Sequence, residues 1–78
     1  FNVKVFPNPA KGFITLESDA GMEGTISLID ALGRTVVEMN ANGMSNQVID
    51  VRDLSAGTYV LRVLNNGQLF QERVQIVK

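Results

Sequence analysis

Histidine and cysteine are both absent from the 78 residues of this chain. Their absence excludes a Ser-His or Cys-His nucleophile, an imidazole general base and an ordinary zinc site. Disulfides are excluded too, although this does not fix the cellular compartment, because small secreted domains often but not always carry them. The sequence therefore predicts a domain without catalytic activity and without a cofactor.

Charge of either sign is scarce as well. Seven Lys and Arg stand against eight Asp and Glu, the formal net charge is −1, and no run of like charge occurs. A nucleic-acid-binding domain would be expected to carry a basic stripe, and a peripheral membrane helix would need a basic amphipathic face. No apolar stretch approaches about 18 residues, so no transmembrane helix is expected. We expect neither nucleic acid nor a small-molecule substrate as a partner.

The acidic residues do not form an evident site. Asp50 and Asp53 flank one expected turn, and Glu17 and Asp19 flank another. A calcium site needs about six to eight converging oxygen ligands, whereas these residues belong to different loops. We interpret them as solvated turn residues, since Asp favours turns, and bound calcium stays an open alternative.

What the chain does contain is aliphatic residues in alternation. Of its residues 45% are apolar but only 6% are aromatic, so the core is expected to consist mostly of Val, Ile and Leu. The length supports one domain over residues 1–78. Because the chain starts at Phe1 without Met, directly on a strand pattern, we expect a fragment of a larger secreted protein.

The alternation falls into seven short segments spaced by about 8–12 residues, which is typical of a sandwich. The expected strands cover residues 2–6, 13–17, 24–30, 34–39 and 46–51, followed by two strands on either side of Asn66-Gly67. No helical pattern competes. The predicted fold class is all-β, a seven-stranded antiparallel immunoglobulin-like β-sandwich.

The last two strands give the clearest hairpin signal. Asn66-Gly67 favours a two-residue type I′ turn, because both central residues need a positive φ. That turn pairs Asn65 with Gln68, Val63 with Phe70, Leu61 with Glu72 and Tyr59 with Val74, and it keeps Phe70, Val74 and Ile76 inside. Glu72 then faces the core. Either a bulge turns it away, or its strand lies near a sheet edge.

Three ordered segments carry a recognisable pattern. They are Val5-Phe6-Pro7-Asn8-Pro9-Ala10 with Gly12, then Ile29-Asp30-Ala31-Leu32-Gly33-Arg34, and then the stretch from Leu54-Ser55-Ala56-Gly57-Thr58-Tyr59 to Val63. Together with the closing Val74-Gln75-Ile76-Val77-Lys78, this pattern resembles the type IX secretion system C-terminal sorting domain over residues 2–78. The resemblance rests on the order and spacing of the motifs over the whole chain.

The resemblance implies a function that the residue chemistry does not supply. Domains of this kind are non-catalytic C-terminal secretion signals of a larger cargo protein that first reaches the periplasm. The type IX outer-membrane translocon reads the folded domain, and a sortase-like signal peptidase typically removes it. The cargo then stays at the cell surface or enters the medium. The scissile bond lies upstream of the domain in this family, so we expect it before Phe1.

The motif residues have structural interpretations too. Prolines end a strand, Gly12 and Gly33 relax turns, Gly57 allows a close approach before Tyr59, and Tyr59 fills core. The full motif set is Pro7, Asn8, Pro9, Gly12, Asp30, Gly33, Arg34, Leu54, Gly57 and Tyr59.

Recognition is expected to use exposed residues around these motifs. Arg62, Arg73 and Lys78, on or after the final hairpin, are the candidates for contact with the translocon, which could pair with an edge strand. The same exposed terminal strand could also pair between two copies as an edge-strand dimer.

Two other classes of function stay open. An accessory adhesion or carbohydrate-binding module of a secreted enzyme would need an exposed aromatic patch or calcium-bound loops. The single Tyr lies in a predicted core strand, which disfavours the patch. An enzyme domain is disfavoured by the small size and by the missing His and Cys.

Overall fold

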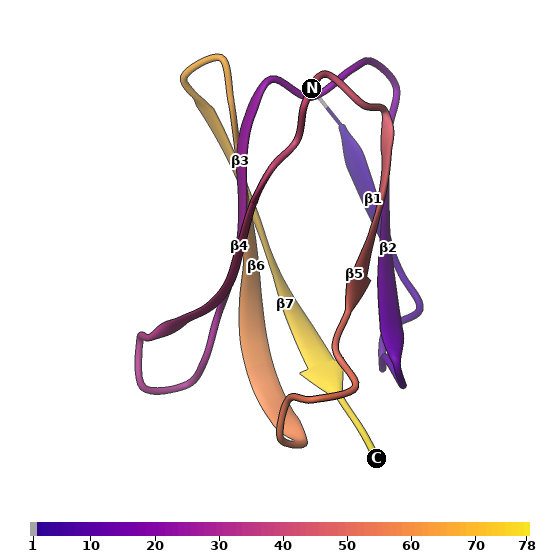
Figure 1. Cartoon of the computed structure of the whole chain (residues 1–78), viewed down its shortest axis with the longest axis vertical. Helices are drawn as coiled ribbons and strands as arrows, with labels where there is room; N and C mark the ends of the chain where they lie inside the picture. The colour runs from indigo at the N-terminus through magenta and orange to yellow at the C-terminus, as the bar shows by residue number, and fades with distance from the viewer. Residues whose placement is uncertain (1) are drawn as a thin grey trace.

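Two antiparallel sheets pack face to face in the computed structural model, which describes residues 2–78 (Figure 1). The smaller sheet has the order β1-β2-β5, and the larger has the order β4-β3-β6-β7. In chain order the strands are β1 (Val3–Phe6), β2 (Phe13–Ser18), β3 (Gly24–Ile29), β4 (Thr35–Asn40), β5 (Asn46–Asp50), β6 (Gly57–Asn65) and β7 (Gln68–Ile76). The predicted seven-stranded antiparallel sandwich is confirmed.

Strand ends match the sequence pattern to within one or two residues, and the differences have local causes. The strand expected over 24–30 ends at Ile29, because Asp30 closes the turn to β4 with its side chain. The strand expected over 34–39 begins at Thr35 for the same reason. Residues 2–78 form no helix that could cross a bilayer.

The core lies between the sheets and is aliphatic, as predicted. Alternate residues of the central strands β2, β3 and β6 point into it, which is the period-2 signature of a half-buried strand. The side chains that are less than 2% exposed and largest in volume are Ile14, Leu16, Met22, Ile26, Leu28, Leu61, Ile76, Val51, Val63 and Val74.

The final hairpin has the predicted register at every position. Asn65 pairs with Gln68 and Leu61 pairs with Glu72, without a bulge. Asn66 has φ 51° and Gly67 has φ 82°, as a type I′ turn requires. Because β7 is an edge strand, Glu72 is only half-buried. The edge explanation for this inward-facing charge is therefore the right one.

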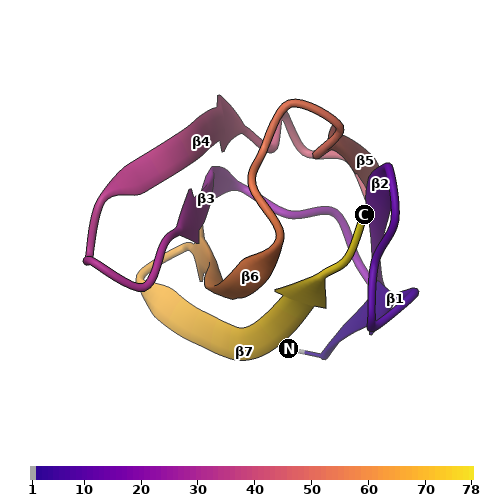
Figure 2. The same ribbon diagram turned by 90° about the horizontal axis from the view of Figure 1, so that it is seen from below.

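Three connections gather at one end of the sandwich. The β1–β2, β3–β4 and β5–β6 connections lie at the lower end in Figure 1, together with the end of β7, whereas the Asn66-Gly67 turn lies at the opposite end. Figure 2 looks onto the lower end and shows the end of β7 beside β1 and β2. All three sequence motifs thus have their turns on one end of the molecule.

Candidate functional site

The middle motif builds the β3–β4 turn around one carboxylate. Oδ1 of Asp30 accepts hydrogen bonds from the backbone N–H groups of Leu32 and Arg34, both at 2.9 Å. Oδ2 of Asp30 accepts a 2.8 Å bond from Nε of Arg34. Gly33 has φ +84°, a conformation that side chains with a Cβ rarely adopt. The pattern D-x-x-G-R is therefore a self-contained turn, closed by its first and last residues.

The same contacts set the charge of this turn. The pKa of Asp30 lies below its ordinary 3.8, mainly because the carboxylate accepts a hydrogen bond from the backbone N–H of Arg34. Desolvation raises the pKa in part, and bonds from the Arg34 side chain and the Leu32 N–H lower it further. The side chain of Asp30 is 12% exposed and that of Arg34 is 72% exposed. The turn thus presents a guanidinium to solvent while its carboxylate is engaged.

The late motif fixes the β5–β6 connection through Tyr59. Its hydroxyl donates a 2.6 Å hydrogen bond to the backbone oxygen of Ser55, and the residue is 7% exposed. A Tyr near the start of a strand that bonds back to the chain a few residues upstream is the tyrosine corner of immunoglobulin-like sandwiches. Leu54 packs half-buried against the core. The prediction that Tyr59 fills core is confirmed, and it also ties the loop.

Gly57 has a different role from the one expected. The space that its Cβ would occupy is open for 4 Å, so no close approach of another segment requires a glycine here. Its φ of +156° is what disfavours other residues. The backbone conformation at the start of β6, rather than packing before Tyr59, explains this glycine.

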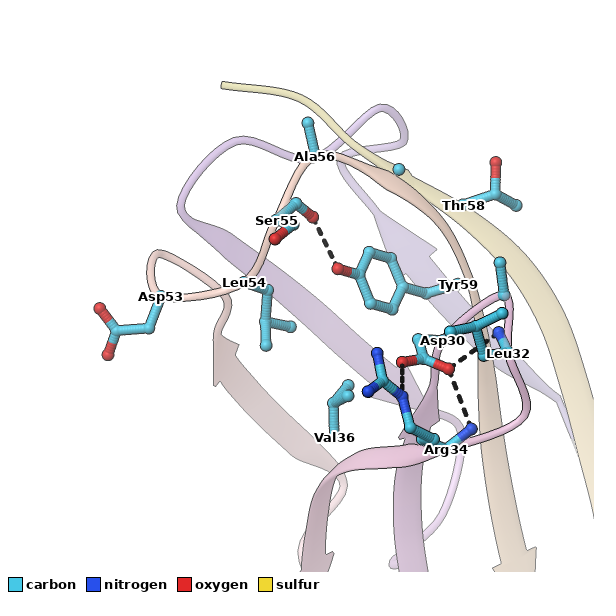
Figure 3. Close-up of a pocket in the computed structure, with 12 residues that line it drawn as sticks. Asp30, Leu32, Arg34, Val36, Asp53, Leu54, Ser55, Ala56, Thr58 and Tyr59 are labelled. Carbon is cyan, nitrogen blue, oxygen red and sulfur yellow. Dashed lines mark hydrogen bonds and ion pairs between the residues drawn. The ribbon is translucent and has the colours of Figure 1, made fainter.

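The middle and late motifs together enclose a groove at the end of the sandwich (Figure 3). It has a volume of about 330 Å³ and lies between the β3–β4 turn and the β5–β6 connection. Arg34 and Asp30 point into it from one side, and Leu54 and Tyr59 lie across from them. No residue of the first motif lines it.

The first motif instead holds the end of β7. The Asn8 side chain accepts a 3.0 Å bond from the Gln75 N–H and donates a 3.1 Å bond to the Arg73 carbonyl, as a peptide group of a neighbouring strand would. Ala10 continues the pairing, since its N–H donates to the Gln75 carbonyl at 2.7 Å and its carbonyl accepts from Val77 N–H at 2.9 Å. We call this set of contacts the Asn8 clasp.

The comparisons with known proteins bear on these motifs directly. The family of secretion system C-terminal sorting domains matches residues 4–78. The chain belongs to this family. The sorting domain is also 29% identical over 77 residues to an endo-acting ulvan lyase of Formosa agariphila, a match that covers 99% of this chain. It spans 15% of the length of that lyase.

The membership gives the domain a coarse function. Type IX sorting domains are C-terminal sorting signals on secreted proteins, and the resemblance that the three motifs carried is confirmed. Each motif has a visible structural role in this sorting domain: the Asn8 clasp, the Asp30 turn and the Tyr59 corner.

The three basic residues expected to contact a translocon do not form one cluster. Arg62 and Arg73 are exposed on the outer face of the larger sheet, where Arg62 pairs with Gln71 and Arg73 with Val60. Neither takes part in an ion pair within residues 2–78. Lys78 lies at the motif end instead, where its Nζ donates a 2.7 Å bond to the Arg52 carbonyl.

A second ion pair stands beside this end. The Arg52 side chain donates two hydrogen bonds to the Asp50 carboxylate, from Nε at 3.0 Å and from Nη2 at 2.7 Å. Its guanidinium lies 5.2 Å from the centre of the Phe13 ring. The side-chain bonds from Arg52, followed by its N–H, lower the pKa of Asp50 to about 2. Among residues 2–78 no three metal-binding side chains come together.

Sequence reasoning missed two surface features. Phe6 and Phe13 are 43% and 45% exposed on the outer face of the smaller sheet, and the sequence analysis did not single them out as an exposed pair. The Asn8 clasp was missed as well, because proline and glycine signals mark where a turn lies but not what the turn contacts. Alternation offered one clue to Phe13, since the buried Ile14 is its neighbour in β2.

Proposed function

We propose that this domain directs a larger cargo protein through the type IX outer-membrane translocon after the cargo has entered the periplasm. A sortase-like signal peptidase then removes the domain at a bond upstream of Phe1. The cargo ends at the cell surface or in the medium. The observation that carries this proposal is the family match over residues 4–78, supported by the placement of all three motif turns at one end of the fold.

The experiment uses a fluorescent reporter that is sent to the periplasm of a bacterium with a type IX system. The reporter is made with and without residues 1–78 at its C-terminus. We expect the fused reporter at the cell surface or in the medium and the bare reporter in the periplasm. A fused reporter that stays periplasmic, although the domain is folded, would contradict the proposal.

A second candidate function has one observation in its favour. An accessory carbohydrate-binding module needs an exposed aromatic patch, and Phe6 and Phe13 supply two exposed rings on one sheet face. The related lyase is named as acting on ulvan, which is a property of that protein. Micromolar binding on a glycan array that is lost in Phe13→Ala would favour this candidate, and an empty array would remove it.

A further inference from the structure

The sandwich has four edge strands, and they differ in how they are protected. The edges are β1 and β5 in the smaller sheet and β4 and β7 in the larger. An edge strand exposes unpaired backbone N–H and C=O groups, and proteins usually blunt it with short length, Lys or Pro, a bulge, an inward-facing charge or a covering segment.

Two of the edges carry such devices within their own strand. β1 has four residues, contains Lys4 and is followed directly by Pro7. β4 has a register shift opposite Leu28 and Ile29, and it carries the exposed Glu38. Both features hinder the addition of a further strand.

The terminal half of the β7 edge is protected by another part of the chain. The Asn8 clasp occupies the outward backbone groups between Arg73 and Val77, and Glu72 places a charge toward the core beside them. The terminal half of β7, which the sequence suggested as a pairing edge, is therefore already paired.

The edge of β5 is also short, at five residues, but it carries no Lys, no Pro, no bulge and no inward-facing charge. The bonds from Val51 N–H to Gly12 O and from Ser18 N–H to Ser45 O flank its pairing with β2. Because facing residues of an antiparallel pair alternate between bonded and non-bonded, the backbone groups of Asn46, Val48 and Asp50 point away from β2. Within residues 2–78 no backbone hydrogen bond is made to them from outside the strand.

We propose that the β5 edge is the docking edge of the domain, where an extended segment of the secretion machinery adds as a fourth strand of the smaller sheet. The inference rests on the proposed sorting function. Strand addition draws its affinity mainly from backbone hydrogen bonds, so it tolerates side-chain differences between partners. That tolerance suits a tag whose relative is only 29% identical.

The chemistry of the edge defines the segment that fits it. Val48 is 56% exposed, and the only charge on β5 is that of Asp50, which is neutralised by Arg52 at the end of the strand. The docking segment therefore presents an uncharged, preferably β-branched residue beside Val48. A charged residue there would lose hydration without gaining a partner.

The test is export of the reporter fusion described above, with Val48→Pro and Val48→Lys in the domain. Proline removes an N–H that faces away from β2, so the ladder of the fold is kept, and lysine places a charge at the centre of the edge. We expect each variant to reduce exported reporter by about tenfold, Val48→Pro through the loss of a backbone bond and Val48→Lys through a charge that loses hydration on docking. Val48→Thr should export like the original.

The matched control is Glu38→Pro on the protected β4 edge. The bond from Ala41 N–H to Gly24 O fixes which residues of β4 are hydrogen-bonded to β3. By the same alternation, the backbone N–H and C=O of Glu38 point away from β3. Circular dichroism melts establish whether each variant folds. If Val48→Pro does not fold, export of Val48→Lys carries the test. Export at the original level in folded Val48 variants overturns the inference, as does an equal loss in Glu38→Pro.

A second copy of this domain is the other segment that could pair with the β5 edge. Sedimentation of the domain that shows a dimer abolished by Val48→Lys, with export unchanged, would assign the edge to a second copy and overturn the inference. Failure of the unmodified domain to export its reporter would instead count against the sorting function itself.

Discussion

At the scale of single residues, the motif side chains act on the backbone around them. The carboxylate of Asp30 holds two N–H groups of its own turn, and the hydroxyl of Tyr59 holds a carbonyl of its own loop. Both groups contact the chain within four residues of themselves. Their effects should therefore appear as changes in stability, with export changing only when the fold is lost.

Removing the Tyr59 hydroxyl tests this. Tyr59→Phe keeps the buried ring but leaves the Ser55 carbonyl without its donor, so we expect the free energy of unfolding to fall by about 1 kcal/mol. Urea denaturation followed by circular dichroism measures it. Thr35→Val, which removes a hydroxyl at an exposed position of β4, is the control. An unchanged midpoint in Tyr59→Phe would show that the corner does not stabilise the fold.

Acid should destabilise the domain through Asp50. Its pKa is lowered from 3.8 to about 2, mainly by hydrogen bonds from Arg52. A lowered pKa in the folded state stabilises the fold fully above the ordinary pKa, and this contribution is lost as the pH falls toward the lowered one. We expect the melting temperature to decrease between pH 4 and 2, and to decrease less steeply in Asp50→Asn. Equal slopes in both proteins would contradict this assignment.

At the scale of elements, the Asn8 clasp joins the first connection to the last strand. Asn8→Ala removes a donor and an acceptor from the β7 edge, so we expect a loss of about 1–2 kcal/mol and faster hydrogen exchange at Gln75 N–H. Asn8→Asp keeps the acceptor but cannot donate to the Arg73 carbonyl. Asn2→Ala, at an exposed position before β1, serves as the control.

If exchange at Gln75 is as slow in Asn8→Ala as in the original, the clasp does not hold β7.

The register of the final hairpin is also set at the scale of elements. A two-residue turn fixes which residues of β6 and β7 face each other, so the pairing of Leu61 with Glu72 followed from local sequence.

At the scale of the whole molecule, the end of the chain is part of the fold. Ile76 is 1% exposed, and the residues around it pair with Ala10. Deleting residues 75–78 removes this buried side chain together with every clasp contact except the bond from Asn8 to the Arg73 carbonyl. Because such a loss costs about 2–5 kcal/mol of a total near 5–15, we expect the truncated domain to melt at a much lower temperature than the original.

Loss of export on that deletion could therefore follow from destabilisation of the fold and would not by itself demonstrate lost recognition. Lys78→Ala separates the two, since it removes only an exposed side chain and one bond to the Arg52 carbonyl. Its melting curve should stay close to the original. A cooperative melt of the truncated domain near the original temperature would show that the end of β7 is dispensable.

The sequence by itself determined whatever depends on neighbours along the chain. Alternation placed the strands and the aliphatic core, Asn66-Gly67 set the last register, and three spaced motifs identified the family. These features can be predicted locally, because side-chain alternation and turn conformation are set by residues that are neighbours in the chain.

The tertiary structure decided what depends on distant residues meeting. Asn8 contacts residues 65 and 67 positions away, the middle and late motifs enclose one groove, and the terminal half of the β7 edge is covered whereas the β5 edge is open. No local pattern encodes these contacts, because the order of strands within each sheet selects which edges are covered. Glu72 shows the division: the sequence found its inward position, and only the sheet order explained why the fold accommodates it.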